Sequence, residues 1–242
     1  MRAGHWTDVL DKGSETDRSE KSSPHSSNPL RAYFDATVNG KGIWKWSHYF
    51  DIYHRHLRKF VGQDVRIAEV GVYSGGSLGM WKAYFGTKCQ VYGIDINEAC
   101  KGYEDGTTKI FIGDQSDRDF WRRFRTAVPD IDIVIDDGGH MPEQQIVTLE
   151  ETLPYIRPGG VYLCEDIHGV HNQFAAYLFG LTDSLNACAL KAGAGSAVTS
   201  TPFQRVICSV HLYPFVTVIE KAANPVQELT SLKRGTEWQP FL

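Results

Sequence analysis

The sequence predicts an α/β fold, with a mainly parallel, seven-stranded sheet that ends in an antiparallel hairpin. Five short apolar runs, typical of strands covered on both faces, alternate with segments whose apolar residues recur at helical spacing. Two further β-branched runs, residues 205–211 and 215–220, are separated by a short turn and predict the hairpin. A chain of 242 residues is long enough for one such domain with appendages.

The first predicted unit, residues 66–81, joins a strand to a helix through a glycine-rich turn. The turn contains Gly71, Gly75 and Gly76, and the helix beyond it would bury Leu78, Trp81 and Phe85 on one face. A turn of this kind presents free backbone N–H groups to a ligand. Glu69 precedes it, and its carboxylate would repel a pyrophosphate but suits a cationic ligand. The ligand of this turn is therefore expected to carry a positive group.

The second strand, residues 89–95, ends in an acid. Asp95 lies 19 residues beyond Gly76, where an acid can accept hydrogen bonds from a ribose diol. A turn or cap before Asn97 would also explain Asp95. The pattern thus indicates a nucleoside-containing ligand but leaves a local structural role open.

The third strand, residues 108–113, is followed by a polar tetrapeptide. Asp114 and Gln115 stand where an adenine edge could be read, and Ser116 or Asp117 can cap the next helix. Capping alone would also explain these residues. The helix after the fourth strand is expected to begin at Pro142 and to continue to residue 156, where residues 157–160 end it.

Acid pairs follow the fourth and fifth strands, residues 131–136 and 161–164. The pairs are Asp136 with Asp137 and Glu165 with Asp166. If the two strands are neighbours, the four carboxylates crowd one region at the ligand-binding edge of the sheet. Like charges so close favour a cation, and Mg²⁺ suits oxygen ligands. Alternatively, Asp136 and Glu165 have separate partners while Asp137 and Asp166 cap helices.

The N-terminal region divides into two parts. Residues 1–30 are expected to form a mobile arm, and residues 31–62 an aromatic helical segment with Ser47 as N-cap. This segment either packs on the sheet or covers a ligand. The candidate substrate-contacting residues are Trp44, His48, Tyr49 and, beyond the fifth strand, His168. His54 and His56 are expected to be exposed rather than metal ligands.

Composition narrows the possible partners and compartments. The net charge of −4 gives no basic footprint for nucleic acid. No apolar stretch is long enough to span a membrane, and no signal peptide is evident. Five scattered cysteines indicate a reduced, cytoplasmic protein. We expect a flexible connection at 192–196 and a tail, with Trp238 and Phe241, that docks on the body or on a second subunit of a homodimer.

These motifs resemble those of class I S-adenosylmethionine-dependent methyltransferases, which have a Rossmann-like, doubly wound fold. Residues 69–77 (EVGVYSGGS) are similar to the first motif of that superfamily and residues 93–95 (GID) to its second. Residues 135–140 (IDDGGH) and the pair at 165–166 resemble metal-dependent macrolide-sugar O-methyltransferases and cephalosporin hydroxylase-like proteins. The resemblance covers roughly residues 60–220 and implies a methyltransferase domain over 63–242. The large N-terminal part of the macrolide enzymes is not matched.

The resemblance implies a site for S-adenosylmethionine and Mg²⁺. The implied cofactor-binding residues are Glu69, Gly71, Tyr73, Ser74, Gly75, Ser77, Asp95, Asp114, Gln115, Ser116 and Asp136. The implied Mg²⁺ ligands are Asp137, Glu165 and Asp166, and the implied catalytic residues are His140, as general base, and Asp137. Alternatively, His140 caps the following helix.

The expected function is O-methylation of a small secondary-metabolite hydroxyl. The oxygen would attack the sulfonium methyl in line, aided by alignment, metal and base. A carboxylate acceptor, which needs neither metal nor base, is the alternative within this class. A non-catalytic adenosyl-ligand binding protein is the alternative outside it. A nicotinamide-dependent oxidoreductase and a nucleic-acid methyltransferase lack their motifs here.

Overall fold

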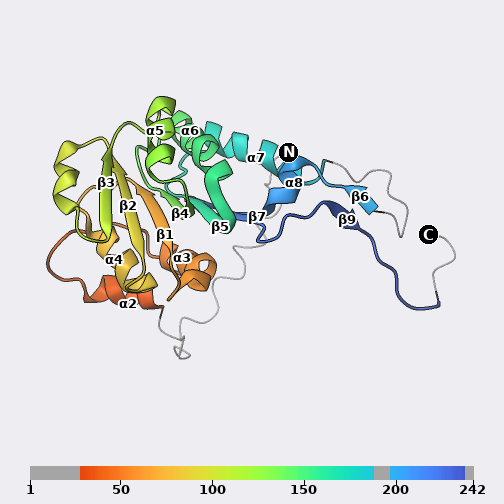
Figure 1. Ribbon diagram of the computed structural model, residues 1–242, viewed down its shortest axis with the longest axis horizontal. Helices are drawn as coiled ribbons and strands as arrows, with labels where there is room; N and C mark the ends of the chain where they lie inside the picture. The colour runs from red at the N-terminus through yellow and green to blue at the C-terminus, as the bar shows by residue number, and fades with distance from the viewer. Residues whose placement is uncertain (1–27, 188–196, 238–242) are drawn as a thin grey trace, which may run out of the picture.

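The computed structural model describes residues 28–187 and 197–237, and its centre is a seven-stranded sheet in the order β3-β2-β1-β4-β5-β8-β7 (Figure 1). The strands are β1 (Arg66–Val70), β2 (Gln90–Asp95), β3 (Thr108–Ile112), β4 (Ile131–Asp136), β5 (Ile156–Cys164), β7 (Ile207–Tyr213) and β8 (Val216–Lys221). Strands β1 to β5 pair in parallel, whereas β8 is antiparallel to both β5 and β7. The predicted parallel sheet with a closing hairpin is confirmed.

Helices cover both faces of this sheet (Figure 1). One layer holds α2 (Pro29–Ala36), α3 (Tyr49–Leu57) and α4 (Gly76–Phe85), and the other holds α5 (Arg118–Ala127), α6 (Pro142–Thr152) and α7 (Gln173–Leu185). The shorter elements are η2 (Arg58–Phe60), η3 (Glu98–Tyr103), η4 (Leu153–Tyr155) and α8 (Pro202–Val206). Strands β6 (Ala197–Thr199) and β9 (Glu228–Thr230) form a separate antiparallel pair beside the main body. None of the helices in the described ranges is long and apolar enough to cross a membrane.

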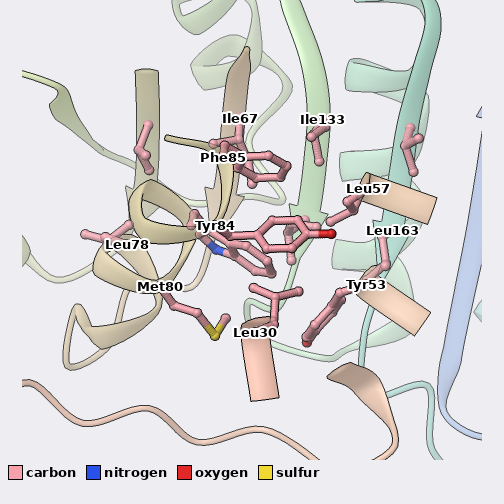
Figure 2. Packing of buried hydrophobic residues seen from close by; sticks show 14 of the residues in the cluster. Leu30, Tyr53, Leu57, Ile67, Leu78, Met80, Tyr84, Phe85, Ile133 and Leu163 are labelled. Atoms are coloured by element: carbon pink, nitrogen blue, oxygen red, sulfur yellow. The ribbon is translucent and has the colours of Figure 1, made fainter. Parts of the chain in front are cut away.

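The apolar core under α2, α3 and α4 fixes the position of the helix that borders the site. Figure 2 shows Tyr53 and Leu57 of α3 directed toward Leu163 of β5, with Leu30 of α2 beside them. The predicted inner face of α4 is buried as expected, and Trp81 is fully inaccessible to solvent. Burial of each such side chain stabilises the fold by roughly 1.5–3 kcal/mol. The helix α3 is therefore held firmly along its length.

Two predictions near the N-terminus are wrong. Helix α2 begins at Pro29, within the predicted mobile arm 1–30, because Asn28 caps it by accepting from the backbone N–H groups of Leu30 and Arg31, and Pro29 fills its first turn. Ser47 does not cap α3, since the N-cap position is His48 and its side chain makes no capping hydrogen bond. Of the predicted arm, residues 1–27 lie outside the described residues, as do the connection 192–196 and the tail with Trp238 and Phe241.

The helix predicted to run to residue 156 stops earlier. Helix α6 ends at Thr152, a short η4 turn follows, and β5 already begins at Ile156 rather than at Val161. Pro154 explains the difference, because a proline has no backbone N–H with which to continue the hydrogen bonds of the helix. The apolar spacing of Leu153 continues the helical pattern by coincidence.

Candidate active site

A cavity of about 570 Å³ opens at the carboxyl ends of β1, β2, β4 and β5. The strand order reverses at β1, because β2 and β3 follow on one side of it and β4 and β5 on the other. Open parallel sheets bind ligands at such a point. The segment 37–48 between α2 and α3, here named the strap, provides one wall with Gly42, Ile43, Trp44, Lys45 and Trp46. The glycine turn after β1 and the acidic ends of β4 and β5 line the same cavity.

Asp95 at the end of β2 is bound to the glycine turn. Its Oδ2 accepts from the backbone N–H groups of Val72 and Tyr73 at 2.9 and 3.0 Å, and its Oδ1 accepts from Asn97 at 2.8 Å. The residue lines the cavity as well. It therefore has the local role that the sequence left open and is also part of the cavity wall.

Several predicted cofactor residues line the cavity and others do not. Those that line it are Gly71, Tyr73, Ser74, Ser77, Asp95, Asp114 and Gln115. Those that do not are Glu69, Gly75, Ser116 and Asp136, and the predicted substrate contact His48 is also outside the lining. Instead, Glu69 lies fully buried behind the turn, where the Ser77 hydroxyl donates to its Oε2 at 2.8 Å. Its Oε1 lies 3.9 Å from the Nζ of Lys45, which does line the cavity.

Gln115 joins the ends of β3 and β4 rather than presenting a free amide. Its Oε1 accepts from the backbone N–H of Gly139 at 2.7 Å, and its Nε2 donates to Asp136 Oδ1 and to Thr148 Oγ1 at 3.0 and 3.1 Å. Both amide groups are therefore engaged, which weakens the predicted role of this side chain in reading an adenine edge. Its contacts hold the loop that carries the acids.

Asp136 points away from the cavity. Gln115 and the hydroxyl of Tyr162 donate to its two oxygens, each at 3.0 Å, and burial raises its pKa to about 7. Asp136 therefore has partners of its own, as the alternative from the sequence stated. This disfavours its predicted role in binding the cofactor. Three of the four acids at the strand ends, Asp137, Glu165 and Asp166, do line the cavity.

Lys45 of the strap lies among these acids. Its Nζ is 2.5 Å from Asp137 Oδ2, 3.0 Å from Glu165 Oε2 and 3.9 Å from Glu69 Oε1. Burial alone would lower the pKa of Lys45, but the carboxylates outweigh it and hold the pKa above its usual range. Burial, with the nearby charge of Asp137, raises the pKa of Glu165. One ammonium faces three carboxyl groups here, so acidic groups still outnumber cations in the cluster.

The third acid, Asp166, is oriented by the aromatic segment. The hydroxyl of Tyr49 and the indole N–H of Trp46 both donate to Asp166 Oδ1, at 2.7 and 3.0 Å. Asp166 Oδ2 faces His140 Nε2 at 3.7 Å. The ligand atoms of Asp137, His140 and Asp166 lie within 4.8 Å of one another, so they can meet on one small ion or substrate group.

Backbone strain concentrates at this cavity. Within the described ranges, the non-glycine residues with positive φ are Tyr73, His140, Asp166 and Phe215. Three of these line the cavity, and such conformations cost about 1–3 kcal/mol each. His140 has a φ of 58° and lines the cavity. It does not cap α6, because the N-cap position of that helix is Met141.

Aromatic side chains surround the outer part of the cavity. The Phe215 ring lies 5.5 Å from Trp46 and 4.7 Å from His168, and His48 bonds the carbonyl of Pro214 at 3.0 Å. Trp44 is 87% exposed at the rim. The predicted contacts Trp44, Tyr49 and His168 thus line the cavity, whereas His48 does not.

Sequence reasoning missed Lys45 and Tyr53. The Tyr53 hydroxyl donates to Glu165 Oε1 at 2.7 Å in a buried position. The spacing of Tyr49 and Tyr53, four residues apart on one helix, was a usable signal for two hydroxyls aimed at one place. The surplus of acids predicted at the strand ends could have prompted a search for a nearby lysine.

The strand order, the glycine turn after β1 and the acid ending β2 define the class I S-adenosylmethionine-dependent methyltransferase fold. The 8-demethyl-8-alpha-L-rhamnosyl tetracenomycin-C 2'-O-methyltransferase of Streptomyces olivaceus is 31% identical over 208 residues, which are 78% of this chain and 54% of that protein. The mycinamicin VI 2''-O-methyltransferase of Micromonospora griseorubida is 32% identical over 71% of this chain and 47% of its own. No protein-family model matches the chain.

A solved structure agrees with these relatives. The MycE methyltransferase of the mycinamycin biosynthetic pathway, in complex with Mg and SAH, superposes with a TM-score of 0.65 at 28% identity, covering 83% of this chain and 55% of its own. The chain is therefore a homologue of sugar O-methyltransferases from secondary-metabolite pathways. It spans about half the length of the curated relatives that it matches.

Proposed function

We propose that the protein is an S-adenosylmethionine-dependent O-methyltransferase that acts on a hydroxyl of a small secondary metabolite, with a sugar as the preferred acceptor. The observation that carries this proposal is the meeting of Asp137, Asp166 and His140 in the cavity that the glycine turn also lines. The relatives support it, since those named above methylate sugar hydroxyls.

The glycine turn and the end of β2 would hold the cofactor. Residues of the turn line the cavity, and Asp95 and Asp114 border it where ribose and base would lie. When bound, S-adenosylmethionine supplies an electrophilic methyl on a sulfonium. The buried carboxylate of Glu69 lies behind this region and makes it unsuitable for a pyrophosphate.

Asp137, Glu165 and Asp166 would hold Mg²⁺. Their donor set is all carboxylate, which a hard divalent ion prefers, and the ammonium of Lys45 already shows that the cluster attracts cations. When bound, Mg²⁺ supplies Lewis acidity toward acceptor oxygens. The MycE structure is a complex with Mg and SAH, which supports the same cofactors here.

His140 would take the proton of the acceptor hydroxyl. Its side chain is partly exposed to the cavity, and Asp166, fixed by Tyr49 and Trp46, stands 3.7 Å from its Nε2. A carboxylate in that place orients an imidazole and stabilises the imidazolium that proton transfer creates. The strained backbone at His140 keeps the ring aimed into the cavity.

Substitution of His140 tests this assignment. His140→Asn should lower kcat by about 10²- to 10⁴-fold, because general-base catalysis contributes that much. The affinity of this variant for S-adenosylhomocysteine, measured by calorimetry, should not change. In the wild type, EDTA should stop turnover until Mg²⁺ is restored. His171→Asn, at an exposed histidine beyond the site, is the matched control. Near-normal turnover of His140→Asn would contradict the role of His140 as general base.

Two other readings give different results in the same assay. A carboxylate acceptor is already ionised, so turnover would persist in EDTA and in His140→Asn, where only KM would rise. A non-catalytic adenosyl-ligand binding protein would bind S-adenosylhomocysteine but transfer no methyl to any acceptor. The homodimer and the cytoplasmic location stay predictions, and sedimentation velocity tests the first.

A further inference from the structure

The position of Lys45 raises a question about metal binding, because it uses oxygens that the metal would need. Its Nζ bonds Asp137 Oδ2 at 2.5 Å and both oxygens of Glu165 at 3.0 and 3.1 Å. The hydroxyl of Tyr53 occupies a further position on Glu165 Oε1 at 2.7 Å. Two of the three candidate metal ligands are therefore already engaged by an internal cation.

The ammonium is well suited to stay there while no other cation is present. The Lys45 side chain is 3% exposed, and the charge of Glu69 also lies 3.9 Å from Nζ. Removal of a buried cation from such acids would leave uncompensated negative charge, which is strongly unfavourable. While no other cation is present, Lys45 thus holds these acids in place.

A divalent ion on the same oxygens would lie within a few ångströms of Nζ. Two cations so close repel strongly in a site that excludes water. Resting on the proposed function, we propose that Lys45 is an internal competitor of the divalent ion: its ammonium occupies the acid cluster until the metal displaces it. Metal binding then has to overcome the contacts of Lys45, which weakens metal affinity.

The strap gives this displacement a route. Lys45 lies between two fixed points, the backbone of Gly42, whose carbonyl packs on Gly76, and Trp46, whose indole bonds Asp166. A lysine side chain can leave the acids by rotating about its own bonds, while the strap stays anchored at both points. Displacement would move a positive charge toward the cavity that the acceptor enters.

Calorimetric titration with Mg²⁺ alone, without cofactor or acceptor, tests the proposal. Lys45→Gln should lower the Kd for Mg²⁺ by about tenfold or more, because the competing charge is gone. Asp137→Asn added to Lys45→Gln should abolish the gain, which places the ion at the cluster. Lys82→Gln is the matched control, since Lys82 pairs with Asp105 and neither residue lines the cavity.

Thermal unfolding provides a second readout. In EDTA, Lys45→Gln should melt below the wild type, because buried carboxylates lose their counter-charge. Mg²⁺ should then raise the melting temperature of Lys45→Gln more than that of the wild type. Lys45→Met serves the same comparison if Lys45→Gln does not fold.

Each outcome decides the proposal. Equal or weaker Mg²⁺ binding by Lys45→Gln overturns it while leaving the metal part of the proposed function intact. If neither protein binds Mg²⁺, both the Lys45 proposal and the Mg²⁺ site of the proposed function are overturned. Methyl transfer measured in EDTA then tests the rest of the proposed function by itself. Binding by Lys45→Gln alone overturns the displacement, because Lys45 is then the permanent cation of the wild-type site, and it overturns the metal part of the proposed function as well.

Discussion

His56 shows how a single residue can depart from its expected environment. It was expected to be an exposed helix histidine, yet it is only 4% exposed. Its Nδ1 lies 3.0 Å from Glu220 Oε1, its Nε2 bonds the hydroxyl of Tyr213 at 2.8 Å, and the tilted ring of His211 lies 4.5 Å from its own. Burial outweighs Glu220 and lowers the pKa of His56. The C-terminal end of α3 is therefore fixed to the edge of the sheet by a neutral imidazole.

This pKa shift predicts a dependence of stability on pH. The unfolded chain protonates His56 near its ordinary pKa of about 6.5, whereas the folded protein resists protonation, so stability is lost as pH falls below that value. Between pH 7.5 and 5.5 the His56 contribution should be on the order of 1 kcal/mol. Urea unfolding should show His56→Gln losing this component and His54→Gln keeping it. Equal pH dependence in all three proteins would contradict the account.

The glycine turn makes a prediction at the scale of an element. Gly71 has φ of +89°, and a Cβ there would lie 1.9 Å from the carbonyl oxygen of Asp137. Gly86, at the end of α4, has φ of +95° but open space around it. Gly86→Ala should therefore cost about 1–3 kcal/mol through backbone strain alone.

Gly71→Ala should in addition displace the loop that carries Asp137. Calorimetry should show S-adenosylhomocysteine binding lost in Gly71→Ala and kept in Gly86→Ala, with urea unfolding as the measure of stability. Similar affinities in the two variants would mean that the close approach of the two loops does not shape the cofactor site.

The strands and most helices could be predicted because their signals are local. Apolar runs and helical spacing are written in consecutive residues, and the carboxyl ends of parallel strands necessarily share one edge, which brought Asp137 and Glu165 together. Lys45 could not be placed, since no periodicity fixes the path of the strap. The start of α2 was misplaced because its few apolar residues follow a polar stretch, although Asn28 with Pro29 is a recognisable start.

At the scale of the whole molecule, helix α3 connects two parts of the sheet. The site lies at the carboxyl ends of the parallel strands, and the other end of α3 contacts β7 and β8. Tyr49 and Tyr53 of α3 hold Asp166 and Glu165, and His56 at the other end of the same helix bonds Glu220. The sequence could indicate the acids but not this shared support, which depends on how α3 crosses the sheet. The chain matches only about half of each curated relative, so its own activity needs direct measurement.

The most direct test is transfer of an isotopically labelled methyl group from S-adenosylmethionine to a deoxysugar-bearing polyketide in the presence of Mg²⁺, followed by mass spectrometry. The account predicts one labelled methyl on a sugar hydroxyl, formed by the wild type and far more slowly by His140→Asn. Label on a carboxyl group, or cofactor binding with no labelled product on any glycosylated acceptor, would contradict it.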